Sequence, residues 1–81
     1  MVIEWIVQLT LPQAVIDRPI IYHLIRQFDL LTNIREAHVH TDTGWLILSL
    51  QGEPETIQQA IDWMTGQGIA VEVLSKGKGR A

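Results

Sequence analysis

The order in which the hydrophobic pattern changes its period constrains the fold of this chain more than any other feature. The segment VIEWIVQLTL, residues 2–11, alternates with a period of two, which is typical of a β-strand with one apolar face. That face carries Ile3, Trp5, Val7, Leu9 and Leu11. Pro12 cannot donate a hydrogen bond to a strand ladder, so the strand is predicted to end there.

The next segment, DRPIIYHLIRQF at residues 17–28, changes to helical spacing. Asp17 is the expected N-cap, and Pro19 fits the first turn of a helix. One stripe of this helix is predicted to be buried, and it consists of Ile21, Leu24, Ile25 and Phe28. The pattern breaks over residues 29–33, where Asn33 is expected to form a turn.

Two further strands follow, joined by a hairpin turn. Residues 34–41 alternate, with Ala37, Val39 and Thr41 on one face and Glu36, His38, His40 and Asp42 on the other. The turn TDTG, residues 41–44, places Gly44 where a positive φ is expected. Residues 45–50, WLILSL, form the third predicted strand.

The last part of the chain repeats the change from helix to strand. Pro54 follows Gly52 and begins a second predicted helix, which Gly66 and Gly68 end. Its apolar stripe consists of Ile57, Ala60, Ile61 and Met64. Residues 69–74, IAVEVL, form the last predicted strand.

The element order β-α-β-β-α-β predicts an α+β fold. Two helices with one apolar stripe each must cover the same face of a four-stranded antiparallel sheet. Right-handed crossovers place the first and third strands in the centre, which is the ferredoxin-like sandwich. Residues 1–75 are predicted to form this single domain. Residues 76–81, with two lysines, an arginine and two glycines, are predicted to be a flexible basic tail.

The composition argues against several classes of protein. The chain has no cysteine, which excludes a disulfide framework and a cysteine-bound metal or iron–sulfur centre, and favours a cytoplasmic setting. No segment reaches the ~18 apolar residues of a membrane span. Residues 1–75 hold three arginines and nine acidic residues, a net charge of −6 that repels nucleic acid. An outward Trp45 is the one feature shared with RNA-recognition domains of this topology.

The face of the sheet that no helix covers is predicted to hold an apolar patch. If the first and third strands are central, Ile6, Trp45 and Ile47 lie together on that face. An exposed apolar patch on a soluble chain indicates an interface, and the simplest partner is a second copy related by a two-fold axis. A domain of 81 residues is also close to the lower limit of stability, so a homodimer would stabilise it.

No motif for catalysis or cofactor binding is present. His38 and His40 point the same way on a strand, but two imidazoles do not complete a metal site, and exposed polar residues at alternate positions explain them. Nucleophile elbows and glycine-rich phosphate loops are absent from the sequence. We therefore expect no enzyme activity, no metal and no cofactor.

The sequence resembles the NIL domain family from Val7 to Leu74. The matching segments are LTL, RPIIYHLIRQFDLLTNI and GWLILSLQGEPETIQQAIDWMTGQGIAVEVL. That family is best known as the C-terminal regulatory domain of methionine-import ABC transporter ATPases, and it also occurs fused to ferredoxins and as short cyanobacterial proteins. The resemblance implies a ferredoxin-like fold.

The resemblance also implies a ligand and a site. Paired NIL domains of the transporters bind methionine at their shared interface and so inhibit import. Carried over to this chain, the ligand-binding residues are Asn33, Ile34, Arg35, Ala37 and Val39. The family's Asn-Ile-Leu is Asn-Ile-Arg here, so an arginine replaces a leucine at the site, where it would pair with an amino acid's carboxylate or prevent methionine from fitting.

Three hypotheses of function follow. The first is a small stand-alone regulatory domain that binds methionine or a related amino acid at a homodimer interface and acts on a separate protein partner. The alternative is a protein–protein interaction module that binds no small ligand and docks through its open sheet face. A third, an accessory protein for electron transfer, follows only from the ferredoxin fusions.

Overall fold

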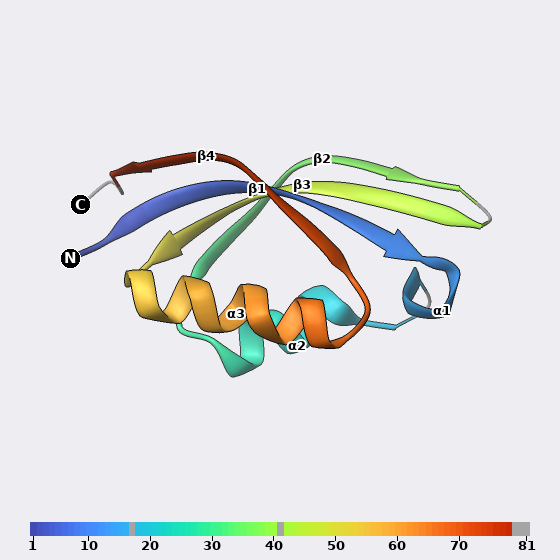
Figure 1. Ribbon diagram of the computed structural model, residues 1–81, viewed down its shortest axis with the longest axis horizontal. Helices are drawn as coiled ribbons and strands as arrows, with labels where there is room; N and C mark the ends of the chain where they lie inside the picture. The colour runs from blue at the N-terminus through green and yellow to red at the C-terminus, as the bar shows by residue number, and fades with distance from the viewer. Residues whose placement is uncertain (17, 41, 79–81) are drawn as a thin grey trace.

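The computed structural model describes residues 1–16, 18–40 and 42–78. It forms one sheet with helices packed beneath it (Figure 1). The elements in chain order are β1 (Ile3–Pro12), α1 (Gln13–Ile16), α2 (Ile20–Gln27), β2 (Leu31–Val39), β3 (Thr43–Gly52), α3 (Pro54–Gly66) and β4 (Ala70–Lys78).

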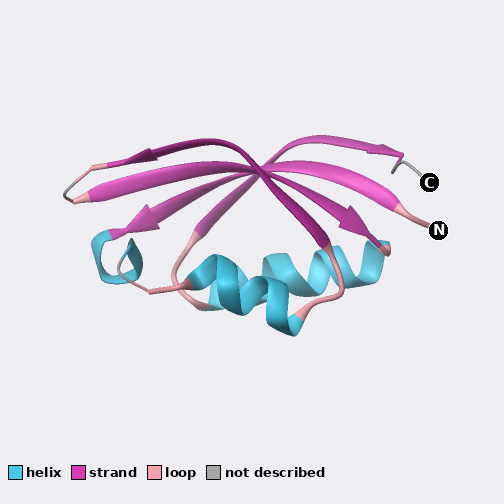
Figure 2. Ribbon diagram, turned by 180° about the vertical axis from the view of Figure 1, so that it is seen from behind, coloured by secondary structure: helices cyan, strands magenta, loops and turns pink. Residues whose placement is uncertain are grey.

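The four strands form an antiparallel sheet in the order β2-β3-β1-β4. The first and third strands are therefore central, as predicted. All helices lie on one side of the twisted sheet and leave the other side open (Figure 2). This arrangement confirms the predicted α+β fold of ferredoxin-like type. No helix among the described residues is long and apolar enough to cross a membrane.

The core lies between the sheet and the helices. The periodicity predicted its centre well: Val7 and Leu9 of β1 and Leu48 and Leu50 of β3 are fully buried. The helices contribute Leu24 of α2 and the α3 residues Ile57, Ala60 and Met64. Phe28 and Trp63 close one side with an edge-to-face contact, their ring centroids 6.0 Å apart.

The first helical segment differs from the prediction. The chain makes a short additional helix, α1, directly after Pro12, and Val15 of that helix is buried. The longer helix α2 begins only at Ile20, with Pro19 as N-cap. Ile25, predicted to be buried, is 51% exposed, because it lies on the flank of α2 that the sheet does not cover. Asp17, the predicted N-cap, lies outside the described residues.

The strand β2 begins earlier than predicted. It starts at Leu31, so Asn33 is a strand residue paired with Ser49 and does not form a turn. The prediction was wrong because Asn33 follows a leucine and a threonine, whose strand preference outweighs the turn preference of one asparagine. Thr41, the predicted end of this strand, lies outside the described residues.

Gly44 and Gly68 are required for different reasons, close packing at Gly44 and a positive φ at Gly68. Gly44 was predicted at a positive φ, but within the described residues only Gly68 has one, of +88°. Gly44 is instead a β3 residue whose added Cβ would lie 3.2 Å from the carbonyl oxygen of His38, so close approach of β2 explains it. Gly68 ends α3 as predicted, because the Gly68 and Ile69 amides donate to the carbonyls of Thr65 and Met64 in a Schellman motif.

The strand β4 extends beyond its predicted end. Lys76, Gly77 and Lys78 continue the ladder with β1 and are not part of a flexible tail. The remaining residues of the predicted tail, 79–81, lie outside the described residues.

Candidate functional site

A pocket of about 280 Å³ opens at one end of the sheet, beneath the free edge of β2. Segments far apart in the sequence build it: the end of β1, the short helix α1, the start of α2, and parts of β2 and β3. Its walls consist of Leu11, Val15, Ile16, Arg18, Pro19, Ile20, Ile21, Tyr22, Ile34, Val39 and Leu46.

The local sequence explains why a hollow forms here. Pro12 ends β1, and α1 then returns the chain beneath the sheet, anchored by buried Val15. The amide of Arg18 donates to the carbonyl of Val15, and the amide of Ile20 donates to the carbonyl of Arg18. The residues that follow α1 line one side of the pocket, and Ile34 and Val39 of β2 line the other.

The walls are almost entirely apolar, and Arg18 supplies their charge. Its guanidinium Nη1 donates to Oε1 of Gln67 at 3.1 Å, which orients the side chain. A guanidinium has five N–H donors in a planar fork, so most of them stay available to a ligand. The rim of the pocket is exposed and apolar: Tyr22 is 57%, Ile34 56% and Val39 63% exposed.

The structure brings two of the five predicted ligand residues to this pocket. Ile34 and Val39 line it, because their partners Leu48 and Gly44 place them on the helix side of the sheet. Ala37 also faces the helix side, opposite Leu46, but does not line the pocket.

The other two predicted ligand residues lie apart from the pocket. Asn33 pairs with Ser49 and faces the open side of the sheet. Arg35 is an exposed residue at an irregularity of β2, where the pairing with β3 shifts between Ile34 and Glu36.

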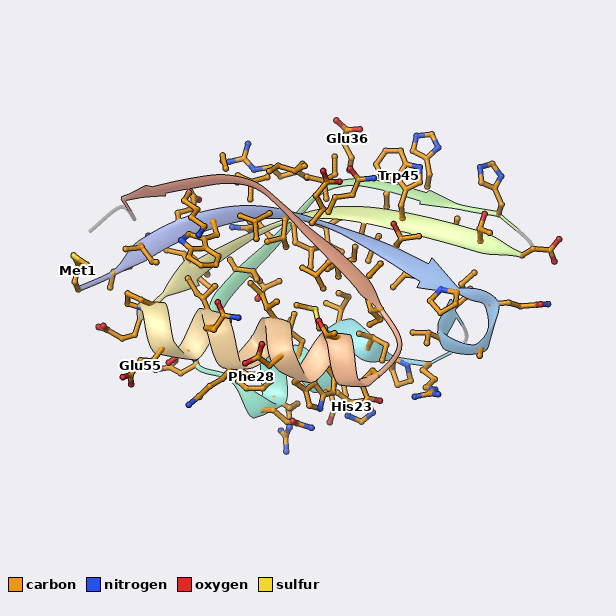
Figure 3. The ribbon with its side chains drawn as sticks, viewed as in Figure 1. Met1, His23, Phe28, Glu36, Trp45 and Glu55 are labelled. Carbon is orange, nitrogen blue, oxygen red and sulfur yellow. The ribbon has the colours of Figure 1, made fainter. Side chains whose placement is uncertain are left out.

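The predicted interface residues lie together on the open face. Ile6, Trp45 and Ile47 are each partly buried by neighbouring side chains. The ring of His38 stacks on Trp45 with a centroid distance of 4.5 Å and an interplanar angle of 18°. Trp45 and Glu36 project away from the helices (Figure 3). The described residues contain no group of three or more side chains that could hold a metal.

Sequence reasoning missed Arg18 and Tyr22. Arg18 directly precedes Pro19, and both were regarded only as the start of a helix. Tyr22 lies off the apolar stripe of α2 and is exposed. The sequence does show an arginine and a tyrosine near the start of a helix. Only the path of α1 in the structure shows that Arg18 and Tyr22 line a pocket together with Ile34.

Comparisons with known proteins agree with this architecture. The family model described as NIL domain matches residues 5–73. A methionine import ATP-binding protein, MetN 2, of Oenococcus oeni is 29% identical over 79 residues, which is 93% of this chain and 22% of that protein. The MetN of Coxiella burnetii is 34% identical over 62 residues, 72% of this chain and 18% of that protein. The chain thus spans about a fifth of the length of these relatives.

Solved structures show the same fold. The C-terminal domain of an ABC transporter ATP-binding protein from Enterococcus faecalis superposes with a TM-score of 0.76 and 24% identity, covering 88% of this chain and 83% of that one. A designed protein, Foldit4, superposes with a TM-score of 0.62 and 11% identity, covering 99% of this chain and 100% of that one. Because a designed protein shares the fold, the fold alone does not specify a function.

Proposed function

Because the chain belongs to the NIL domain family, we propose that it is a regulatory domain that binds methionine or a related amino acid in the pocket between α2 and β2. The observation that carries the proposal is an apolar hollow whose lining includes one cationic residue, Arg18. The relatives are methionine import proteins by name. Their ATP binding is not carried over, since the chain covers about a fifth of their length.

The size and chemistry of the pocket suit a small amino acid with an apolar side chain. At about 280 Å³ it lies near the lower end of the roughly 300–1,000 Å³ of typical ligand sites. Val15, Ile20 and Leu46 are buried and offer the aliphatic surface that a thioether chain prefers.

Arg18 would bind the ligand's carboxylate. A guanidinium and a carboxylate form a planar, bidentate pair, and charge-assisted hydrogen bonds are about twice as strong as neutral ones. Arg18 also lies two residues before α2, whose N-terminal end carries partial positive charge. Both features favour an anionic group at the same end of the pocket.

Ligand binding would be coupled to assembly. The pocket lies at the free edge of the sheet, so a second copy next to β2 would contact the ligand or its walls. A ligand that binds only the assembled form stabilises that form by mass action. We therefore propose a homodimer whose stability reports the concentration of the amino acid, and a separate protein that responds to it.

Calorimetric titration tests this function. We expect L-methionine to bind, and L-methioninol, which has no carboxylate, to bind at least tenfold more weakly. In Arg18→Met the two compounds should bind equally weakly, because the group that distinguishes them is gone. Neither heat nor a thermal shift with a panel of amino acids at millimolar concentration would reject the proposal.

The open face of the sheet supports a second candidate function. The described helices all lie on the other side of the sheet (Figure 2). Ile6, Trp45 and Ile47 are only partly buried, which leaves part of each side chain accessible to a protein partner. Under this alternative, Trp45→Glu removes partner binding and Arg18→Met leaves it intact. Under the first proposal, Arg18→Met weakens the binding of methionine and Trp45→Glu leaves it intact.

A further inference from the structure

The pairing of the strands arranges the side chains of the open face in rows across the sheet. Residues that pair across neighbouring strands lie side by side and point to the same face. Trp45, Ile47 and Ser49 of β3 face the open side, since the leucines that alternate with them are buried beneath the sheet. From β2 across to β4, the rows on this side are His38, Trp45, Thr10 and Ala70, then Glu36, Ile47, Gln8 and Glu72, then Asn33, Ser49, Ile6 and Ser75.

The middle of these rows is apolar. Ile6, Ile47 and Trp45 occupy neighbouring positions on the two central strands and are only partly buried; we call them the open-face patch. The ring of His38 stacks on Trp45 and enlarges the patch. Trp45 projects away from the helices (Figure 3). Because aromatic side chains are enriched at the centres of protein interfaces, the patch is suited to an apolar partner surface.

The charged side chains around the open-face patch are carboxylates. Glu36 and Glu72 stand at the two ends of the middle row, on the edge strands. Glu4, one row further along β1, accepts a hydrogen bond from Oγ of Ser49 at 2.7 Å. That bond holds its carboxylate at the patch, because Ser49 pairs with Ile6. Neither lysine nor arginine occurs in the three rows, which the structure describes in full.

The two outer carboxylates are available to another molecule. Glu36 and Glu72 are exposed, and neither forms an ion pair with the described residues. Arg35, the basic residue nearest to Glu36 in the sequence, pairs with no residue of β3 and lies outside the rows. A cation that meets Glu36 and Glu72 from above the sheet therefore has to come from a partner.

The charges argue against a second copy of the chain on this face. Two copies stacked through their open faces would bring carboxylates against carboxylates, and like charges that meet across an interface oppose binding. A cationic surface is the complementary one. The open face thus selects a basic partner with an apolar centre.

The spacing of the carboxylates fits an α-helix. Glu36 and Glu72 are three strand spacings apart, about 14 Å, and a helix with its side chains is about 10–12 Å wide. Along β3, Trp45 lies four residues from the row of Ile6, about 14 Å, which a helix spans in about nine residues. Apolar side chains at positions i, i+4 and i+7 of such a helix would follow the patch, and basic side chains on both flanks would reach the two glutamates.

We propose that the open face binds a basic amphipathic helix of a partner protein. The apolar stripe of that helix packs on the open-face patch, and its cationic flanks pair with Glu36 and Glu72. The proposal rests on the second candidate function, whose partner it identifies by chemistry, and it is independent of the ligand in the pocket.

Peptides of defined charge test the proposal by fluorescence anisotropy with the full chain. The probe is a labelled amphipathic peptide of about 18 residues, long enough to form a helix, with a leucine stripe and lysines on both flanks. Two matched peptides carry glutamine or glutamate in place of the lysines. We expect the lysine peptide to bind at least tenfold more tightly than the glutamine peptide, and the glutamate peptide not to bind.

The outcomes separate the partner's chemistry from the docking function. Equal binding of the lysine and glutamine peptides would overturn the proposed basic partner and leave the open face a docking surface. No binding of the lysine peptide would overturn the proposal. Neither outcome bears on methionine, which is titrated separately.

Charge-neutralised variants locate the peptide on the sheet. The double variant E36Q/E72Q should bind the lysine peptide about tenfold more weakly than the wild type. The control E55Q/D62N removes the same charge from the exposed side of α3 and should bind within twofold of the wild type. Equal losses in the two double variants would show that only net charge matters and would overturn the proposal.

Sedimentation velocity distinguishes this partner from a second copy. Trp45→Ser should weaken binding of the lysine peptide about tenfold and leave the self-association of the chain unchanged. Loss of self-association in Trp45→Ser would show that a second copy covers the open face, and the proposal would fail.

Discussion

The two edges of the sheet, β2 and β4, are of similar length and have different surfaces. Each has nine residues and one irregularity in its pairing. On β2 the exposed charges Arg35 and Glu36 are adjacent and lie at the irregularity of the pairing with β3. On β4 the charges Glu72 and Lys76 lie on opposite faces of the sheet, since Glu72 pairs with Gln8 and Lys76 with Trp5.

One charged side chain of the β4 edge, Lys76, also has a partner within the chain. The ammonium group of Lys76 lies 4.3 Å from the centre of the Trp5 ring, a cation–π contact that holds the charge at the edge. A charged lysine on an edge strand discourages further pairing. We therefore expect β2 to be the edge at which a second copy associates, and β4 to be the edge that discourages association.

The largest expected difference between the two edges is the effect of an introduced charge on self-association. Ile34→Asp puts a carboxylate into the proposed interface and beside the pocket, so we expect self-association to weaken on the order of a hundredfold. Leu74→Asp is the matched change on β4, at a residue that is 45% exposed. Sedimentation should show no change for Leu74→Asp. Equal losses in both variants would remove the distinction between the edges.

Removing one cation near each edge separates ligand binding from stability. Arg18→Met should lower the affinity for L-methionine by about 1.5–3 kcal/mol, the value of a hydrogen bond to a charged group. Lys76→Met should leave this affinity unchanged and cost about 0.5–1 kcal/mol of unfolding free energy through loss of the Trp5 contact. Calorimetry and urea unfolding measure the two quantities. A loss of affinity in Lys76→Met would contradict the location of the site.

Glycine substitutions compare the packing beside the two edges. Gly44→Ala places a Cβ 3.2 Å from the carbonyl of His38, so we expect β2 to shift and the protein to lose about 1 kcal/mol of stability. Gly77→Ala on β4 meets its nearest atom, the carbonyl of Glu4, at 3.7 Å, which is ordinary contact. Its stability should stay within about 0.5 kcal/mol of wild type in thermal unfolding. A reversed order of the two variants would refute this packing argument.

The smallest expected effect concerns the open face next to β2. His38→Ala removes a ring stacked on Trp45 and should cost about 0.5–1 kcal/mol of unfolding free energy. His40→Ala is the control, because its ring is tilted and lies 6.4 Å from that of His38. Its unfolding free energy should match the wild type, and a larger loss than for His38→Ala would show that the stack has no stabilising role.

The sequence predicted the fold because each element carries its own period. Val7, Leu9 and Leu48 fall on one face of their strands whatever surrounds them, so alternation alone found the centre of the core. The predicted burial of Ile25 was wrong, because helical spacing does not indicate which flank of an apolar stripe the sheet covers. The turn predicted at Asn33 was wrong, because the turn preference of one residue competes with the strand preference of its neighbours.

The candidate site was predictable only in part. Ile34 and Val39 were found through the resemblance to a family, and alternation alone would not have distinguished them from other strand residues. Arg18 could not be placed, because its contact with Gln67 joins segments 49 residues apart and depends on the unpredicted helix α1. The irregularity of β2 between Ile34 and Glu36 was not predictable either, because only the pairing with β3 reveals it.

An NMR titration of the backbone amides with L-methionine tests the central claim most directly. We expect the resonances of Val15, Arg18, Tyr22 and Ile34 to shift with one common affinity, and those of β4 to stay in place. Amide shifts centred on Trp45 and Ile47, or none at millimolar methionine, would show that the hollow beneath β2 is not the site.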